Sequence, residues 1–325
     1  MKKIVIDVCG ADAGLLPVVD GTAKALKQGV TFFPVLVGPA AELEAMLTAR
    51  GISKEQYELV DATDAVTNDD PPTCVFAGKE ESSLVKAYQR LKSDGDCCAM
   101  VSPGSTGALL VGSICRLGLL PGLKFPVLGS ALPCSPDNMV CLVDCGANIE
   151  CTASDLVRFA KMGEVFSRCH CGIENPRVGL MNVGREEGKG TALTKEAYEK
   201  LKALPLNFVG NLEGSDLVSG YADVVVTDGF SGNILLKSTE AAGKLAMQIV
   251  AEAAGDADPA LVAKLQQAIF KKLEFNSQGA ATFLGPKKIV VKMHGCANED
   301  TVVSAIRHAL QLEESGFIEA MTQAL

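Results

Sequence analysis

The feature that most constrains this chain is a recurring pattern of short apolar, β-branched runs, each ending in a polar loop with Gly, Asp or Asn. A helical pattern often follows the loop. Near-continuous hydrophobic strands that alternate with helices are typical of a parallel sheet covered on both faces. The sequence therefore predicts an α/β fold with a doubly wound, mostly parallel sheet and helices on both faces. The runs are Lys3–Val8, Phe32–Val37, Cys97–Val101, Val127–Leu132, Met139–Val143, Arg177–Asn182, Ala222–Thr227 and Lys288–Lys292.

The same pattern extends along the whole chain of 325 residues, without an internal repeat of fixed period or a low-complexity linker. Hydrophobic residues make up 48% and charged residues 21%, which is enough apolar surface for a large core. We expect one large domain over residues 1–325, with a projecting helical subregion at about 255–283. Asp258 and Pro259 begin a helix there, as an N-cap followed by proline in the first turn.

Charge and cysteine content exclude several classes of protein. The 39 acidic and 30 basic side chains leave a net charge of −9, and Trp is absent, so general nucleic-acid binding is disfavoured. No apolar run approaches the roughly 20 residues that span a bilayer, and Asp7 interrupts the first run too early for a signal-peptide core. Twelve Cys without a signal peptide indicate free thiols in a reducing cytoplasm. Cys169-His170-Cys171 lacks a second ligand pair, so we expect no metal site.

One loop has the residues of an anion site. Ser102-Pro103-Gly104-Ser105-Thr106-Gly107-Ala108 lies between a predicted strand and a predicted helix. Backbone N–H groups at a helix N-terminus bind anions, and the helix dipole reinforces them. The loop is not a Walker motif, because no Lys follows the second Gly. The alternative is a tight strand–helix turn that binds nothing.

Four further polar loops follow predicted strands, and parallel strands would bring them to the same edge of the sheet. With the Ser102–Ala108 loop they predict a crevice for an anionic ligand, where Lys189 and Arg185 supply positive charge. The alternative for this charged loop is a solvated segment with weak ion pairs. The two carboxylates of the Asp7–Asp12 loop suit catalysis, cation binding or helix capping, and capping is the favoured interpretation for either Asp. The four loops are Asp144–Asn148, Asn182–Gly190, Asp228–Asn233 and His294–Asn298.

At these residues the sequence resembles the bacterial phosphate acyltransferase family of phospholipid synthesis, from Lys3 to about Leu310. The resemblance implies acyl transfer from acyl-(acyl carrier protein) to inorganic phosphate, giving acyl phosphate, without a cofactor. It also implies an α/β/α subunit, akin to phosphotransacetylases and isocitrate-type dehydrogenases, that forms a cytoplasmic homodimer in peripheral contact with the membrane. The matching segments are Val101–Leu109, Val143–Asn148, Asn175–Gly190, Ala222–Lys237 and Lys292–Asn298.

The sequence also departs from this family's pattern. Cys9 and Ala11 replace a Met and a Gly of the first loop, and of an Arg-rich segment before Ser82 only Lys79 remains. These departures leave two alternatives open. One is the acetyl-phosphate-forming component of a glycine-reductase-type system, and the other is a non-catalytic homolog that binds an acyl group or an anion.

The implied reaction needs no enzyme nucleophile, because phosphate attacks and a thiolate leaves, and no Ser-His-Asp or Cys-His triad is evident. We expect the Ser102 loop to hold phosphate, Lys189 to offset its charge and Asn side chains to donate toward the thioester or phosphate. His294 is either a proton donor to the departing sulfur or structural. The expected catalytic residues are Lys189, Asn233, His294 and Asp228. The expected phosphate- or substrate-binding residues are Ser102, Gly104, Ser105, Thr106, Gly107, Asn148, Asn182, Gly184, Glu186, Gly229, Ser231 and Gly232.

The carrier protein is expected to be acidic, as this chain is. Because salt screens the attraction between charges more than about 8 Å apart, the two proteins can associate only through a local basic patch. Two sets of lysines qualify. They are Lys264, Lys271 and Lys272, or Lys287, Lys288 and Lys292. The helix Pro259–Phe275 also has an apolar stripe, which suits either a dimer contact or a membrane-surface anchor; the dimer contact is favoured. The stripe consists of Leu261, Leu265, Ala268, Ile269 and Leu273.

Overall fold

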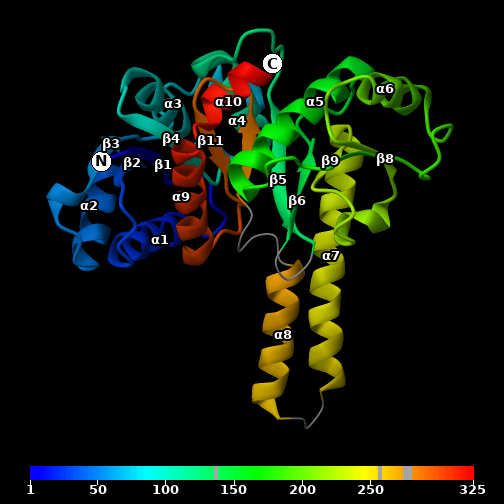
Figure 1. Cartoon of the computed structure of the whole chain (residues 1–325). Helices are drawn as coiled ribbons and strands as arrows, with labels where there is room; N and C mark the ends of the chain where they lie inside the picture. The colour runs from blue at the N-terminus through cyan, green and yellow to red at the C-terminus, as the bar shows by residue number, and fades with distance from the viewer. Residues whose placement is uncertain (135–137, 255–257, 274–279) are drawn as a thin grey trace. The chain divides into compact units, whose positions relative to one another are not determined.

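The computed structural model describes residues 1–134, 138–254, 258–273 and 280–325, and of residues 270–273 only the backbone. The chain forms two compact units, Met1–Val127 with Gly279–Leu325 and Leu128–Gln278. Both units contain mostly parallel strands with helices around them, which confirms the predicted α/β class (Figure 1). The expectation of one domain over 1–325 stays a prediction.

The first unit contains six strands in the order β3-β2-β1-β4-β11-β10. All neighbours are parallel except β10 and β11. Every residue of β4 is buried, so helices cover both faces of the sheet there. Because β1, β4 and β11 are parallel, their carboxyl ends and the loops that follow lie at one edge. The strands are β1 (Lys3–Asp7), β2 (Phe33–Gly38), β3 (Glu58–Asp61), β4 (Cys97–Ser102), β10 (Ala281–Leu284) and β11 (Ile289–Lys292).

Helices pack on this sheet as the apolar periodicity predicts. The helix α3 buries Leu84, Ala87, Tyr88 and Leu91 against β1 and β4, while α9 packs on β4 and β11 and against α1. Gly316, which adopts a φ of +67°, separates α9 from α10. The helices are α1 (Leu16–Lys27), α2 (Ala40–Ala49), α3 (Ser83–Ser93), α4 (Thr106–Gly112), α9 (Glu299–Glu314) and α10 (Phe317–Ala324).

The second unit contains five strands in the order β5-β6-β9-β7-β8. The strands β5 and β6 form an antiparallel pair, whereas the other neighbours are parallel. The two predicted runs in this region therefore form a hairpin and are not joined by a helical crossover. The strands are β5 (Val127–Pro133), β6 (Met139–Val143), β7 (Val178–Met181), β8 (Phe208–Leu212) and β9 (Val224–Val226).

The helices of the second unit are α5 (Ala153–Phe166), α6 (Ala192–Lys202), α7 (Gly229–Ala253) and α8 (Pro259–Leu273). The helix α5 packs on β6 and β9, and α8 lies beside α7 as a hairpin that extends beyond the strands of its unit (Figure 1). The predicted helical subregion at about 255–283 contains α8, but its last residues belong to β10 in the sheet of the first unit.

Candidate active site

Three of the predicted loops meet at one edge of the sheet of the first unit. The amide of Asp12 donates to the carbonyl of Gly295 at 2.8 Å, which joins the loop after β1 to the loop after β11. The amide of Met293 donates to the carbonyl of Ser102, also at 2.8 Å, which joins the loop after β11 to the loop after β4. Within this unit, the expected convergence of strand-end loops is therefore present.

The loop after β1 also approaches the loop after β4, and glycine permits the contact. Gly10 has a φ of +93°, a conformation that side chains with a Cβ rarely adopt. A Cβ at Gly10 would lie 3.2 Å from the Cα of Gly104. The glycine of the first loop thus allows the two backbones to pack together.

The buried carboxylate of Asp7 holds the loop after β4 in place. Ser83 Oγ donates to its Oδ1 and Ser102 Oγ donates to its Oδ2, both at 2.6 Å. Burial raises the pKa of Asp7 to about 6, against the opposing effect of these hydrogen bonds. The Ser102 hydroxyl in turn accepts the amide of Gly104 at 3.0 Å. Asp7 therefore stabilises the loop through hydrogen bonds with Ser83 and Ser102. It was expected to cap a helix, and these hydrogen bonds take the place of that role.

Two groups expected to bind phosphate are used inside the loop. The amide of Gly104 donates a hydrogen bond to the Ser102 hydroxyl. Ser105 Oγ caps α4, because it accepts a hydrogen bond from the amide of Ala108 at 3.3 Å. The amides of Ser105, Thr106 and Gly107 make no hydrogen bond to another described residue. These amides begin a helix, where the backbone dipoles favour an anion. The expected phosphate-binding groups therefore narrow to these three amides and the Thr106 hydroxyl.

The turn after β11 places a thiol against an imidazole. The Sγ of Cys296 lies 3.0 Å from Nδ1 of His294, and the amide of Cys296 donates to the same nitrogen at 3.3 Å. The amide of Ala297 closes the turn by donating to the carbonyl of His294 at 3.0 Å. The pair is a contact of two residues and not a triad, and no contact between these two side chains was predicted from the sequence. A Cys two residues after a His, across a glycine, was the available signal.

In the second unit, the buried carboxylate of Asp144 organises the loop after β6. It accepts the amides of Gly146, Ala147 and Asn148 at 3.0, 3.0 and 2.7 Å. Burial raises the pKa of Asp144, although these amides oppose the rise. The Nδ2 of Asn148, expected to donate toward substrate, donates to Asp144 at 2.8 Å. In this structure Asn148 therefore supports the loop.

The loop after β9 forms the N-cap of α7. Asp228 accepts the amide of Ser231 at 2.8 Å and its hydroxyl at 2.9 Å. The amide of Gly229 donates to the carbonyl of Asn148 at 2.7 Å, which joins this loop to the loop after β6. A Cβ at Gly232 would lie 1.8 Å from a carbonyl oxygen of that same loop. The residues expected in catalysis or substrate binding here therefore cap α7 or allow its first turn to pack against the loop after β6. They are Asp228, Gly229, Ser231 and Gly232.

Two expected catalytic residues, Asp228 and Asn233, lie in this region. The Asp228 side chain accepts hydrogen bonds from Ser231, whereas the Asn233 side chain makes no hydrogen bond to another described residue. It is exposed on the first turns of α7. Gly146, with a φ of +130°, lets the loop after β6 run close by, since an added Cβ would lie 3.3 Å from the Asn233 Cβ. The amide of Asn233 therefore stays available to a ligand.

Side chains on both sides hold the loop after β7, which carries Lys189. Asn182 Nδ2 donates to the carbonyl of Lys189 at 3.2 Å, so this expected substrate donor is used within the loop. Asn211 Nδ2 donates to the carbonyl of Glu186 at 2.9 Å. Gly184 lies under two side chains, because an added Cβ would lie 2.9 Å from Glu186 Oε2 and 3.2 Å from Lys189 Cγ.

The two cations of this loop have different environments. The guanidinium of Arg185 pairs with Asp216, a carboxylate that is 2% exposed, and lies 5.3 Å from the ring centroid of Tyr221. Burial acts to raise the pKa of Asp216, but Arg185 and the hydrogen bond from the amide of Glu213 together outweigh it, so the pKa is lowered. The ammonium of Lys189 is exposed and makes no ion pair with another described residue. Lys189, and not Arg185, therefore remains as the cation for an anionic ligand.

Sequence reasoning missed Asn211 and Asp216, which fix the lysine loop from the end of β8. The signal was present, because Asn211-Leu212-Glu213-Gly214 is another polar loop with Gly after an apolar run. The predicted loops thus form one cluster in the first unit and, in the second unit, the joined loops after β6 and β9 together with the loop after β7. That all five line one crevice stays a prediction.

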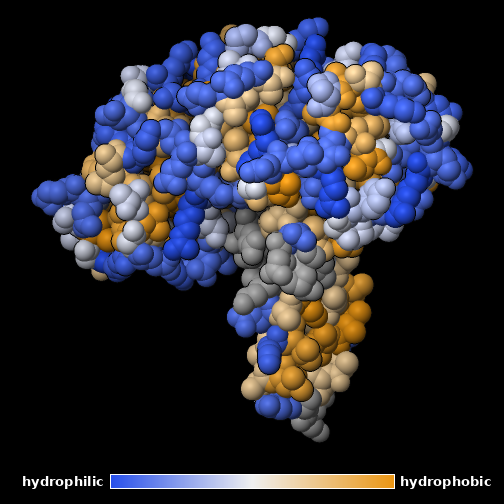
Figure 2. All heavy atoms as spheres, viewed as in Figure 1, coloured by the Kyte–Doolittle hydropathy of each residue, from blue (hydrophilic) through white to orange (hydrophobic). Residues whose placement is uncertain are grey.

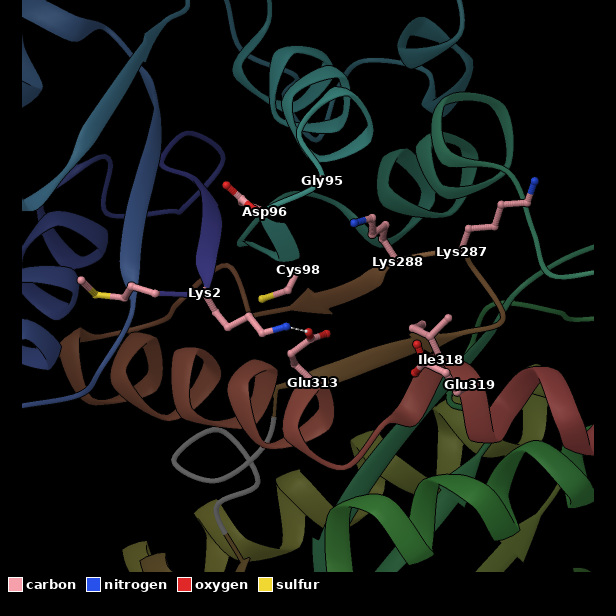
Figure 3. Close-up of a pocket in the computed structure, with 10 residues that line it drawn as sticks. Lys2, Gly95, Asp96, Cys98, Lys287, Lys288, Glu313, Ile318 and Glu319 are labelled. Carbon is pink, nitrogen blue, oxygen red and sulfur yellow. Dashed lines mark hydrogen bonds and ion pairs between the residues drawn. The ribbon is translucent and has the colours of Figure 1, made fainter.

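A cavity of about 630 Å³ in the first unit lies at the opposite edge of its sheet, where β1, β4 and β11 begin. Lys287 and Lys288 line it, with Lys2 pointing toward Glu313 across the cavity (Figure 3). Lys292 ends β11 at the loop edge, and its Nζ donates to the carbonyl of the next residue at 3.0 Å. The three lysines expected to form one basic patch are therefore divided between two edges.

Comparison with known proteins places the chain in a family. The model of the family described as "Fatty acid synthesis protein" matches residues 2–320. The phosphate acyltransferase of Clostridium novyi (strain NT) is 36% identical over 322 residues, covering 98% of this chain and 96% of that protein. The phosphate acyltransferase of Clostridioides difficile (strain 630) is 35% identical over 326 residues, covering 99% and 95%.

Solved structures support the fold. A phosphotransacetylase from Streptococcus pyogenes has a TM-score of 0.65 at 19% identity, covering 96% of this chain and 94% of that one. A branched-chain phosphotransacylase from Enterococcus faecalis V583 has a TM-score of 0.62 at 16% identity, covering 96% and 98%. At these identities the likeness concerns the α/β fold alone. Because the family model and the curated relatives both match nearly the whole sequence, the chain belongs to the fatty acid synthesis protein family, among the phosphate acyltransferases.

Proposed function

We propose that this protein transfers an acyl group from a thioester to inorganic phosphate and so forms acyl phosphate for phospholipid synthesis. The observation that carries the proposal is that the amides of Ser105, Thr106 and Gly107, at the start of α4, make no hydrogen bond to another residue of the described part of the chain. Backbone N–H groups that converge at a helix start suit a phosphate dianion. Membership of the phosphate acyltransferases supports the same reaction.

The chemistry requires positioning more than it requires a strong acid or base. A phosphate oxygen attacks the thioester carbonyl, the carbon–sulfur bond breaks, and the thiolate leaves with a proton. Holding phosphate beside the thioester can supply roughly 7–11 kcal/mol, and one donor to the developing oxyanion about 3–4 kcal/mol. Asn233, whose side-chain amide makes no hydrogen bond to another described residue, and Lys189 are the proposed side-chain contributors.

Lys189 provides the test of the phosphate site. A charge-assisted hydrogen bond contributes about 1.5–3 kcal/mol, so Lys189→Ala is expected to raise the KM for phosphate about 10- to 100-fold. Lys195→Ala is the matched control, because Lys195 is an exposed cation on α6 whose ammonium makes no ion pair or hydrogen bond with another described residue. Equal KM values for phosphate in the two variants would show that Lys189 does not bind phosphate.

The decisive assay follows phosphate-dependent thiol release and identifies the acyl phosphate by mass spectrometry. Long-chain acyl-(acyl carrier protein) is the proposed donor, and an acetyl thioester is the comparison. Faster turnover of the long-chain substrate supports a role in phospholipid synthesis. A preference for the acetyl thioester would favour acetyl phosphate formation instead. Binding of phosphate or acyl ligand without any turnover would show a non-catalytic homolog.

We further propose that the acyl carrier protein docks at a local basic patch, because both partners are acidic overall. The net charge of this chain is −9. Lys264 on α8 is exposed and available for such a contact. The side chains of Lys271 and Lys272, expected beside it, lie outside the described residues. Charge reversal at Lys264 should raise the KM for the carrier substrate and leave the KM for phosphate unchanged.

The hairpin of α7 and α8 carries an exposed apolar surface, which we propose to be the contact of a homodimer. Figure 2 shows hydrophobic residues gathered over the outer part of these two helices. About half of each of four side chains is exposed: Leu245 and Ile249 at 56% and 54%, Leu261 and Leu265 at 51% and 47%. Peripheral contact with the cytoplasmic face of a membrane is the alternative for the same surface. Among the described residues, no helix has the length and apolar character to cross a membrane.

A further inference from the structure

The Cys–His pair after β11 has a geometry that a structural turn does not require. The Sγ of Cys296 lies within hydrogen-bond distance of the Nδ1 of His294, at 3.0 Å, and the cysteine is exposed. The turn is already closed by backbone hydrogen bonds, from the amide of Ala297 to the carbonyl of His294 and from the amide of Asp12 to the carbonyl of Gly295. The thiol is therefore presented to solvent without being needed to hold the turn.

The hydrogen bonds also assign the tautomer of the imidazole. The backbone amide of Cys296 can only donate, and it donates to Nδ1 of His294 at 3.3 Å. Nδ1 therefore carries a lone pair, and the proton of the neutral ring is on Nε2. The thiol then donates to the same nitrogen, which makes Nδ1 a base placed to receive the thiol proton. A nucleophile within reach of an oriented base is the arrangement that activates cysteine.

The turn that carries this pair follows β11, the strand next to β4 in the sheet, and β4 leads into the proposed phosphate-binding loop of the same unit. The amide of Met293, the residue before the imidazole, donates to the carbonyl of Ser102 at 2.8 Å, at the start of the loop that leads to Thr106. A group attached to Cys296 would thus be carried by a turn that is joined to the phosphate-binding loop. The position fits a relay of the acyl group more directly than a remote regulatory thiol.

We propose that Cys296 accepts the acyl group from the thioester donor before phosphate receives it, with Nδ1 of His294 as the base. The proposal rests on the proposed function and adds a covalent intermediate to it. Sγ attacks the thioester carbonyl, its proton passes to Nδ1, the donor carbon–sulfur bond breaks, and the departing thiolate takes that proton. A phosphate oxygen then attacks the carbonyl of the Cys296 thioester, the carbon–sulfur bond to Cys296 breaks, and acyl phosphate leaves. The released Sγ takes up the proton of the attacking hydrogen phosphate through Nδ1 of His294, which regenerates the thiol.

Thermodynamics favours a cysteine for this step. Exchange of one thioester for another conserves the energy of the acyl bond, so the acyl group on Cys296 remains reactive enough to form acyl phosphate. Transfer to a serine hydroxyl would give an oxygen ester, which is a poorer acyl donor. Among nucleophilic side chains, a thiol is therefore the one that suits an intermediate on the way to acyl phosphate.

The intermediate can be trapped by omitting phosphate. The full-length protein is mixed with a long-chain acyl thioester, quenched in acid and examined by intact-protein and peptide mass spectrometry. We expect one acyl group on the Cys296 peptide, released by neutral hydroxylamine and converted to acyl phosphate when phosphate is added. Cys296→Ala should lose the adduct and lower kcat/KM about 100-fold or more. Cys115→Ala, a half-buried thiol of the same unit, is the control.

The role of the imidazole has a separate readout. If Nδ1 takes the thiol proton, iodoacetamide should alkylate Cys296 faster than Cys115 in the wild-type protein, and His294→Gln should slow Cys296 alone by about 10-fold or more. Equal alkylation rates in wild type and His294→Gln would overturn the base.

The outcomes separate this proposal from the proposed function. Undiminished acyl phosphate formation by Cys296→Ala, with no adduct on wild type, would overturn the covalent step and leave acyl transfer to phosphate intact. An adduct that phosphate does not discharge would also overturn it, because the modification would then be a side reaction. No acyl phosphate from the wild-type protein with any thioester would instead refute the proposed function.

Discussion

The substitution Asp7→Asn tests whether a buried carboxylate under the phosphate-binding loop reduces stability at neutral pH. Asp7 is 1% exposed, and its pKa is raised to about 6 from an ordinary value of 3.8 because burial disfavours the charged form. Between these two values the folded protein binds the proton more tightly than the unfolded chain does. The contribution of Asp7 to the free energy of unfolding therefore falls as pH rises from 3.8 to about 6 and is level above that.

The magnitude follows from the same two values. At about 1.36 kcal/mol per pH unit, the interval from 3.8 to about 6 corresponds to about 3 kcal/mol of stability lost on ionisation. Asparagine has the same shape, accepts the hydroxyl of Ser83 and donates to that of Ser102, yet never ionises. We expect Asp7→Asn and wild type to have similar stability near pH 4. Above pH 6 the variant should be more stable by about 3 kcal/mol.

The assay is urea unfolding between pH 4 and pH 8, with amide exchange measured on peptides from β1 and β4 so that the first unit is observed directly. Asp69→Asn is the control, because the Asp69 side chain is exposed and has no hydrogen bond to another described residue. The control should follow wild type at every pH. A difference between Asp7→Asn and wild type that stays constant from pH 4 to pH 8 would refute the argument from burial.

Two further predictions concern the second unit. Gly232→Ala should destabilise it by about 1–3 kcal/mol, measured as a lower urea midpoint, because the added Cβ would lie 1.8 Å from the carbonyl oxygen of Asp144; Gly188→Ala, with no atom within 4 Å, should be neutral. Leu265→Glu on the hairpin surface should convert a dimer to a monomer in sedimentation, while Gln267→Glu on the same helix should not. A monomeric wild type that floats with anionic lipid vesicles would favour the membrane alternative.

Sequence periodicity was sufficient for much of the fold, because long buried strands have a composition that surface segments do not. All eight predicted runs are strands, and β6 has the predicted bounds of Met139–Val143. Two strands that escaped prediction, β3 and β8, lack this signal. The strand β3 is Glu58–Asp61, with a charge at each end, and β8 contains Gly210 at a φ of +92°. Edge strands tolerate such residues because one face or side is not buried.

The sequence by itself determined the class of the fold, the strand-end loops and, through its resemblance to a family, the kind of reaction. Only the tertiary structure decided which polar groups of those loops form hydrogen bonds or ion pairs within the folded chain. Asp7 and Ser83 are separated by 76 positions, and Arg185 and Asp216 by 31, so local patterns could not pair them. A hydroxyl, amide or carboxylate bonds to whichever partner the packed chain brings within about 3 Å. Packing therefore decided that, within the described residues, Lys189 makes no ion pair and the amides of Ser105, Thr106 and Gly107 make no hydrogen bond.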